Sequence, residues 1–311
     1  MKSTTQCSPM KTKFNSILRA DCHSFGAMVC AGAVLLIAAS APAQNLFESD
    51  DNSGCIYEFT PNGGSTTFGS GVYEADELAF NSAGNLFVDD RHGNIYEYAR
   101  NGGSATFASG LGESAGLAFN SAGNLFEADE GSGNIYEFMA NGGSTTFASG
   151  LNEPHALAFN SAGNLFVGDE GSGNIYEFMA NGGSTTFASG LNSSYALAFN
   201  SAGNLFVGDI GFGVHPDSGN LYEFTPNGGS TTFASGLRPT ALAFNSAGNL
   251  FVGGYGSTNI YEFTPNGGSS TFASGGFGPN GLAFQPVPEP STLALLAVGL
   301  LALLPLLRRR A

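Results

Sequence analysis

The chain has 311 residues, a formal charge of −15, 46 glycines and 27 phenylalanines, and it contains no tryptophan. Between residues 44 and 288 the excess of acid is larger, because three basic residues stand against 23 acidic ones, a formal charge of −20. Such a surface repels phosphate backbones, which excludes nucleic acid as a partner, and it favours cations, a basic partner or simple solubility.

The first 43 residues predict an export signal. Three basic residues between positions 11 and 19 precede an apolar stretch (residues 25–39), which ends in Ala41-Pro42-Ala43. A basic region, an apolar core and an A-x-A site are the three parts of a secretory signal peptide. Translation could begin at Met1 or at Met10, and we expect the mature chain to begin after residue 43.

From Gln44 to Gln285 the chain repeats one unit of about 40 residues. Its Leu-Ala-Phe anchor recurs in steps of 39, 40, 40, 45 and 40 residues, at Leu78, Leu117, Leu157, Leu197, Leu242 and Leu282. Each unit holds four short runs, LAFN, LFVGD, NIYEF and STTFAS in the clearest copy, with turn residues between them. Such runs predict strands, and four antiparallel strands per repeat are typical of a β-propeller blade. The Asn-Gly pair before the fourth run predicts a tight hairpin in which both residues take positive φ.

The two ends of the repeat predict that the ring closes. Residues 45–71 supply the second, third and fourth strands of a unit, whereas residues 281–284 supply only a first strand. Five complete units and these two fragments make six blades. We therefore predict an all-β fold, a six-bladed propeller of four-stranded blades over residues 44–286, with one blade shared by the N- and C-terminal strands. Closure also removes exposed sheet edges. The wedges between blades should be filled by the recurring phenylalanines, such as Phe159, Phe166, Phe178 and Phe187.

Residues 287–311 differ abruptly in composition from the repeats. Pro288-Glu289-Pro290 is followed by an apolar stretch (residues 293–307) and then by Arg308, Arg309 and Arg310. This three-part order closely resembles the PEP-CTERM sorting signal of Gram-negative bacteria. The resemblance implies recognition by a membrane protease of the exosortase type and cleavage near the Pro-Glu-Pro box. The chain would pass through the inner membrane by its C-terminal helix and reach the cell surface or the extracellular matrix. A plain membrane anchor is the alternative, although fifteen apolar residues fall short of the ~20 that a spanning helix needs.

The most variable position of the unit lies two residues before the anchor. It holds Asp76, Ala115, His155, Tyr195, Thr240 and Asn280, whereas residues 129–152 and 169–192 are identical. In a propeller this position enters the innermost strand, at one mouth of the central channel. Since the fold does not dictate these residues, we predict that Asp76, His155, Tyr195, Thr240 and Asn280 form a ligand site. His155 is also a candidate general base.

The repeats also resemble NHL and SMP-30/gluconolactonase-like propellers. The resemblance rests on the Pro-Asn-Gly-Leu step at residues 279–282 and on Ala-Gly-Asn-Leu-Phe-Val with the Asp that follows. In gluconolactonase-like enzymes this step supplies oxygen ligands to a divalent metal. Asp76 and Asn280 match that pattern, so the resemblance implies Ca²⁺ or another divalent cation as a cofactor there. Ala115, Tyr195 and Thr240 depart from it, and a site without a cofactor is the other interpretation.

Two sets of acidic residues recur from blade to blade. An Asp follows the second-strand Phe by three residues in five units, at Asp50, Asp90, Asp129, Asp169 and Asp209. These carboxylates could bind Ca²⁺ as a ring, but we favour Asx turns that hold the following loop. A Glu occurs in every third strand, at Glu58, Glu97, Glu137, Glu177, Glu223 and Glu262. A residue present in every blade is better explained by structure or solvation than by catalysis.

Two classes of function remain. The first is a non-enzymatic surface propeller that binds an extracellular glycan, peptide or other matrix partner through its channel mouth. The second is a metal-assisted hydrolase of the lactonase kind. Near-identical blades and the sorting tail favour the first class, and the chain has no P-loop, Gly-x-Ser-x-Gly or HExxH motif. We therefore predict a binding protein.

Overall fold

The computed structural model describes residues 43–50, 53–72, 74–100, 102–211, 219–274 and 278–287. The predicted export segment before residue 43 lies outside the described residues, as does the predicted sorting segment with Pro288, Glu289, Pro290, Arg308, Arg309 and Arg310. Every regular element in the described ranges is a strand. Within the same ranges, no helix has the length and apolar character needed to cross a membrane.

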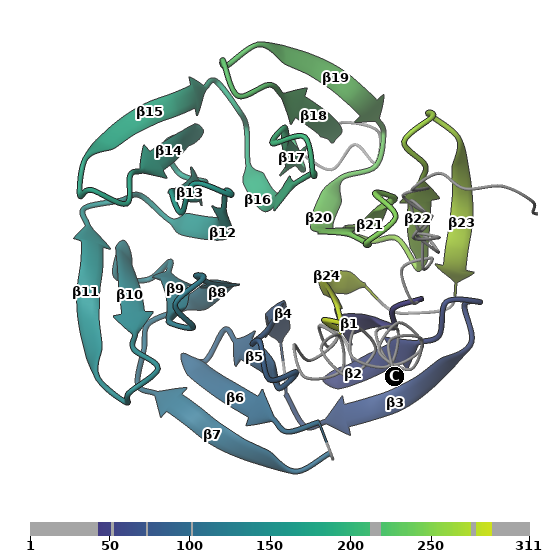
Figure 1. The fold of residues 1–311 in the computed structure, drawn as a ribbon, viewed down its shortest axis with the longest axis horizontal. Coiled ribbons are helices and arrows are strands. Elements are labelled where there is room, and N and C mark those ends of the chain that lie inside the picture. Colours follow the sequence, from purple (N-terminus) through teal and green to yellow (C-terminus); the bar gives the residue numbers. More distant parts are fainter. Residues whose placement is uncertain are drawn as a thin grey trace, which may run out of the picture. The chain divides into compact units, whose positions relative to one another are not determined.

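The strands form six four-stranded sheets around a common axis (Figure 1). The innermost strands are β4 (Ala75–Phe80), β8 (Ser114–Phe119), β12 (Pro154–Phe159), β16 (Ser194–Phe199), β20 (Pro239–Phe244) and β24 (Pro279–Phe284). The second strands are β1 (Leu46–Asp50), β5 (Leu86–Asp90), β9 (Leu125–Asp129), β13 (Leu165–Asp169), β17 (Leu205–Asp209) and β21 (Leu250–Gly254). The third strands are β2 (Cys55–Phe59), β6 (Asn94–Tyr98), β10 (Asn134–Phe138), β14 (Asn174–Phe178), β18 (Asn220–Phe224) and β22 (Asn259–Phe263). The outermost strands are β3 (Ser65–Ser70), β7 (Ser104–Ser109), β11 (Ser144–Ser149), β15 (Ser184–Ser189), β19 (Ser230–Ser235) and β23 (Ser269–Ser274).

We number the blades by chain order, so that blade 1 consists of β24, β1, β2 and β3, and blades 2 to 6 follow from β4 to β23. In blade 1 the last strand of the chain pairs antiparallel with the first, with Leu46 opposite Phe284 and Glu48 opposite Leu282. The six innermost strands then contact one another in a continuous ring. The prediction of a six-bladed propeller closed by a shared blade is therefore confirmed.

Phenylalanines fill the spaces between neighbouring blades. Phe126 of blade 3 packs edge-to-face on Phe147 of its own blade and on Phe159 of blade 4, with ring centroids 5.1 and 5.0 Å apart. Phe147 in turn lies 5.7 Å from Phe178 of blade 4. Phe166 repeats the pattern, and its ring lies 5.0 Å from that of Phe187 in its own blade and 5.0 Å from that of Phe199 in blade 5. These edge-to-face pairs stabilise the contact beyond the burial of apolar area, so the predicted wedge filling is confirmed.

The Asn-Gly hairpins close differently from the prediction. In blade 3, Gly142 N donates to Met139 O at 2.9 Å and Met139 N donates to Gly143 O at 2.7 Å. Gly142 has a φ of 95°, whereas Asn141 does not have a positive φ. The prediction that both residues take positive φ is therefore wrong. A three-residue loop with one left-handed glycine matches the strand twist here, so the asparagine can stay in an ordinary conformation.

The recurring Glu and Asp side chains hold loops in place. In each blade the third-strand Glu accepts a hydrogen bond of 2.6 Å from the Asn that precedes the second strand, as Glu137 does from Asn124. The Asp at the end of the second strand accepts backbone N–H groups. Asp129, for example, accepts hydrogen bonds from Ser132 N at 2.8 Å and from Gly112 N at 2.7 Å. The structural interpretation of the Glu set and the Asx-turn interpretation of the Asp set are confirmed.

Candidate functional site

The six variable positions all lie where the innermost strand departs from regular pairing. In blade 4, Pro154 pairs with Asp169 and Ala156 pairs with Gly168, so that His155 is an extra residue without a partner on β13. The same shift brackets Asp76, Ala115, Tyr195, Thr240 and Asn280 in the other blades. A bulge re-aims a side chain that a regular strand would turn into the sheet. The bulges therefore present one unit-specific residue per blade at the same end of the ring.

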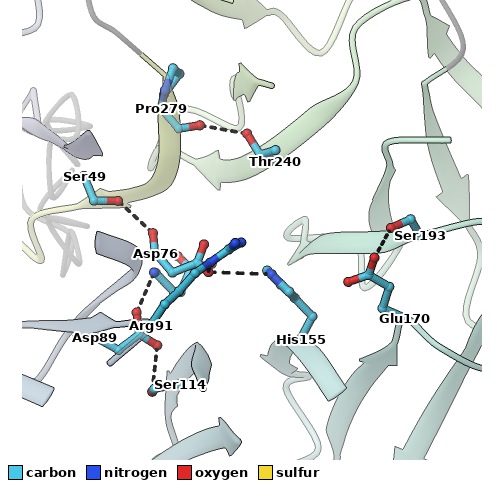
Figure 2. Close-up of polar contacts among 11 residues, drawn as sticks. Ser49, Asp76, Asp89, Arg91, Ser114, His155, Glu170, Ser193, Thr240 and Pro279 are labelled. Carbon is cyan, nitrogen blue, oxygen red and sulfur yellow. Dashed lines mark hydrogen bonds and ion pairs between the residues drawn. The ribbon is translucent and has the colours of Figure 1, made fainter. Parts of the chain in front are cut away.

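Three of these residues come together at the mouth of the channel. His155 Nε2 lies 3.7 Å from Asp76 Oδ2, although blade 3 separates their two blades (Figure 2). The His155 ring also packs on the ring of Tyr195, with centroids 4.0 Å apart. Ala115, the smallest residue of the set, holds the same position in blade 3, between the blades of Asp76 and His155. Both ring nitrogens of His155 are buried and form no hydrogen bond of ordinary geometry.

The other two predicted residues lie apart from this group. The Thr240 hydroxyl donates to Pro279 O of the neighbouring innermost strand at 2.7 Å, so its polar group is engaged in the ring (Figure 2). Asn280 lies on the strand next to Asp76, but within the described residues no hydrogen bond or ion pair joins their side chains. The structure thus divides the predicted site into an assembled half on blades 2, 4 and 5 and a separate half on blades 6 and 1.

The mouth also contains charged residues that the search for variable positions before the anchor did not find. Arg91 follows the second strand of blade 2, and its Nε donates to Asp76 Oδ2 at 3.0 Å. The same position carries Glu130 in blade 3 and Glu170 in blade 4. Glu170 Oε1 accepts a 2.7 Å hydrogen bond from Ser193 Oγ (Figure 2). This position is Glu in two blades but differs in the others, so a comparison of every position between blades would have found it.

Blade 2 carries a second group of buried acids beneath the mouth. Asp89 is completely buried, and its carboxylate accepts Glu77 N at 2.7 Å and Ser114 Oγ at 3.2 Å. The Asp89 side chain thereby provides a hydrogen-bond acceptor inside the wider bulge of this blade, where Asp76 and Glu77 both lack a strand partner. Burial, with the nearby Asp76 carboxylate, raises the pKa of Asp89 well above its usual range.

Burial controls protonation throughout the mouth. It lowers the pKa of His155, and the Asp76 carboxylate opposes this only in part, so the imidazole is neutral near pH 7. Burial and the nearby Glu170 raise the pKa of Glu130 to about 7 and that of Tyr195 to about 12. A neutral histidine, a protonated tyrosine and a carboxylate with a raised pKa can donate and accept hydrogen bonds, and the histidine can also accept a proton.

Whether the mouth can hold a metal ion depends on how many oxygen donors converge on one point there. Within the described residues no group of three or more His, Cys, Asp and Glu side chains is arranged to hold a metal ion. Asp76, one of the two predicted ligands, is already paired with the Arg91 guanidinium. Metal binding by Asp76 and Asn280 stays a prediction. It would require Arg91 to move away from the Asp76 carboxylate.

One family model matches the end of the chain. It is described as the PEP-CTERM protein-sorting motif, and it covers residues 286–311. This match confirms the resemblance of the tail. The motif indicates export with membrane-associated sorting in Gram-negative bacteria, and it implies processing by an exosortase-type system. A comparison with curated proteins gave no significant match.

Solved structures confirm the fold of the repeats. A chain of a nidogen/laminin complex superposes with a TM-score of 0.69 at 16% identity, covering 79% of this chain and 99% of that one. A streptogramin B lyase matches with a TM-score of 0.61 at 13% identity, over 79% and 88% of the two chains. A putative gluconolactonase matches with a TM-score of 0.60 at 13% identity, over 76% and 89%. At these identities the likeness concerns the fold alone, since propellers host many unrelated functions.

Proposed function

We propose that this exported propeller is a non-enzymatic binding protein of the cell surface or extracellular matrix, with its ligand site at the channel mouth. The observation that carries the proposal is the assembly of unit-specific side chains there. Asp76, His155 and Tyr195 come from three blades, lie on bulges and contact one another in sequence. Residues 129–152 and 169–192 of two neighbouring blades are identical, whereas the position before the anchor differs in every blade.

The chemistry of the mouth favours a glycan over a protein ligand. The Tyr195 ring is partly exposed and packs, tilted by 40°, on the buried His155 ring, and sugars present apolar faces that pack on such an aromatic surface. Glu130 and Glu170 supply carboxylates from neighbouring loops, and Arg91 supplies a guanidinium, which together suit a ligand with several hydroxyl groups. A small number of fixed polar groups beside aromatic rings is the usual composition of a selective pocket.

A glycan-binding assay with paired variants tests this proposal. The full-length chain would be screened against neutral and acidic oligosaccharides, and the affinity of the best ligand measured by calorimetry. We expect Tyr195→Ala to weaken binding at least about tenfold, because the aromatic surface at the centre of the site is lost. Tyr255→Ala is the control, since Tyr255 follows the second strand of blade 6, is 58% exposed and stacks with Arg238 instead of His155. Equal effects of the two substitutions would overturn the proposed position of the site.

A metal-assisted hydrolase of the lactonase kind is the second candidate. It is favoured by the neutral His155 beside Asp76 and by the position of Asn280 on the adjacent innermost strand. Titration of Ca²⁺, Mg²⁺ and Zn²⁺ into the full-length chain separates it from the first candidate. One equivalent of metal that is lost in the Asp76→Ala/Asn280→Ala double variant would favour the enzyme and justify a screen of lactones. Several weak equivalents that the double variant leaves unchanged would favour the binding protein.

A further inference from the structure

Two pockets of the same construction open between blades, at the end of the ring opposite the mouth. One lies between blades 5 and 6 and has a volume of about 340 Å³. The other lies between blades 3 and 4 and has a volume of about 250 Å³. Their walls come from equivalent residues of the repeat, four phenylalanines and one glutamate in each. In the second pocket these are Phe126, Phe147, Phe159, Phe178 and Glu137.

The pocket between blades 3 and 4 combines accessible rings with a carboxylate. Phe147 is 38% exposed, although it packs on Phe126 and Phe178. Glu137 uses Oε1 to accept the hydrogen bond from Asn124, and within the described residues its Oε2 has no partner. Met179 completes the rim. A small ligand could therefore contact both aromatic carbon and a carboxylate oxygen.

The charge on this face is uncompensated. The six third-strand glutamates lie in equivalent positions around the ring, and none of them forms an ion pair within the described residues. Arg100 is the one basic residue in the loops between third and fourth strands that the structure describes. It takes the position that Ala180 has in the pocket between blades 3 and 4, and its side chain lies beside Gly84. The Arg100 guanidinium therefore lies at the rim of the groove between blades 1 and 2.

We propose that the interblade pockets bind alkylammonium groups, the chemistry of a lysine side chain or a small organic amine. The aromatic rings would contact the alkyl stem and attract the positive charge through their faces, and the glutamate Oε2 would accept a hydrogen bond from the ammonium. The repeat gives the grooves between blades 2 and 3, 4 and 5, and 6 and 1 the same four phenylalanines and glutamate, whereas the groove between blades 1 and 2 has Tyr98 in place of the fourth phenylalanine. The groove that contains Arg100 is the exception, since a guanidinium already stands at its rim.

Two methionines allow two of these grooves to be observed separately. Met179 lines the pocket that contains Glu137, and Met139 has the equivalent place in the groove between blades 2 and 3, which contains Glu97. In that groove Phe107 packs on Phe87 and on Phe138, with centroids 5.1 and 5.6 Å apart. NMR spectra of the full-length chain labelled with ¹³C at methionine methyls would report each groove by its own signal, assigned with Met→Leu substitutions.

The experiment is a titration with n-butylammonium and, in parallel, with n-butanol, its neutral counterpart of similar size. We expect butylammonium to shift the Met179 and Met139 signals in a saturable way and to bind more tightly than butanol. Glu137→Gln keeps the oxygen that accepts from Asn124 but removes the charge. We expect it to weaken binding about fivefold at Met179 and to leave the Met139 curve unchanged. The reciprocal Glu97→Gln variant should change the Met139 curve alone.

The unchanged signal in each variant also shows that the propeller is folded. Equal affinities for butylammonium and butanol would overturn the proposal, because the pockets would then be apolar clefts without selectivity for charge. Shifts that do not saturate, or glutamine variants that bind like the parent chain, would overturn it as well. None of these outcomes depends on the mouth, so the result is independent of the proposed glycan site.

Discussion

At the scale of single residues, the most informative positions are those where one blade departs from the others. The third residue of the second strand is a buried valine in four blades, as in Val167, but it is Glu48 in blade 1 and Glu127 in blade 3. Both glutamates are almost completely buried, and their carboxylate oxygens form no hydrogen bond. A buried polar group without a hydrogen-bond partner lowers stability, so Glu48 and Glu127 should destabilise the fold relative to valine.

The burial of the Glu127 carboxyl group predicts that stability depends on pH. Burial, with the charges of Asp129 and Asp89 and against a contact with Ser114, raises the pKa of Glu127 from 4.5 to about 9. Between these two values the folded chain binds a proton that the unfolded chain has lost, so stability falls as the pH rises from about 4.5 to about 9. We expect Glu127→Val to raise the free energy of unfolding by about 3 kcal/mol at pH 7.

Urea unfolding at pH 5, 7 and 9 measures this effect. The difference between Glu127→Val and the parent chain should grow with pH, whereas Glu113→Gln, which removes an exposed carboxylate, should follow the parent. Burial and the nearby Asp50 raise the pKa of Glu48 to about 8, so Glu48→Val should behave like Glu127→Val over a slightly narrower range. Parallel pH profiles for the parent and Glu127→Val would show that Glu127 is ionised and solvated in the fold.

The residue scale also shows how far the sequence predicts the site. Variation between copies located Asp76, His155 and Tyr195, because the repeat makes every departure visible. It did not predict that Asp76 and His155 meet, since their contact spans blade 3. Arg91 was missed because the position that follows the second strand was not compared between blades. The bulges could not be predicted from composition, since they arise from pairing with the second strand.

At the scale of elements, the Asp at the end of the second strand connects two loops of its blade in blades 3, 4 and 5. Asp129 accepts one N–H from the loop that follows it and one from the loop that precedes β8. Asp169 does the same with Ser172 and Asn152, at 3.2 and 2.9 Å. In blade 6 the position is Gly254, where a Cβ atom would collide with Leu237 O. Three blades therefore share a carboxylate connection that blade 6 cannot accommodate.

Removal of this connection should destabilise the blade. We expect Asp129→Ala to lower the free energy of unfolding by about 2 to 4 kcal/mol, because two hydrogen bonds to a carboxylate are lost and two N–H groups lose their acceptors. Asp129→Asn keeps one oxygen acceptor and should lower the free energy of unfolding by less. Chemical denaturation would measure both, with Thr145→Ala on the exposed face of β11 as the control. A loss no larger than that of the control would mean that water replaces the carboxylate at both loops.

The hairpins mark the limit of prediction at this scale. The period of the repeat places strands and turns correctly, because each turn is marked by Asn and Gly and each strand by Phe, Tyr, Val or Thr. The Asn-Gly pair nevertheless does not distinguish a two-residue loop from the three-residue loop that is observed. Which loop forms depends on which residues close the hairpin, here Met139 and Gly143, and therefore on the register of the third and fourth strands.

At the scale of the whole molecule, the ring closes through blade 1, and we expect stability to depend on this closure. The phase of the repeat at its two ends predicted this closure, and β24 completes the sheet that β1 begins. Leu282 is buried in the same apolar cluster as Leu46 and Phe251, so this strand also connects blade 1 to blade 6. No internal disulfide secures the ring, since Cys55 is a free thiol in the part of the chain that the structure describes.

Truncation on either side of β24 tests the contribution of closure. A chain that ends at residue 278 lacks β24, whereas a chain that ends at residue 287 keeps it, and both lack the sorting segment. We expect the longer chain to unfold in one cooperative transition and to remain monomeric. The shorter chain exposes the edge of β1 and loses the burial of Leu282, in a fold whose total stability is only about 5–15 kcal/mol. It should therefore melt at a much lower temperature or associate through the exposed strand. Circular dichroism melts and light scattering would measure both effects. Equal melting temperatures with both chains monomeric would mean that five blades and an open edge suffice, and that the shared blade is not what stabilises the ring.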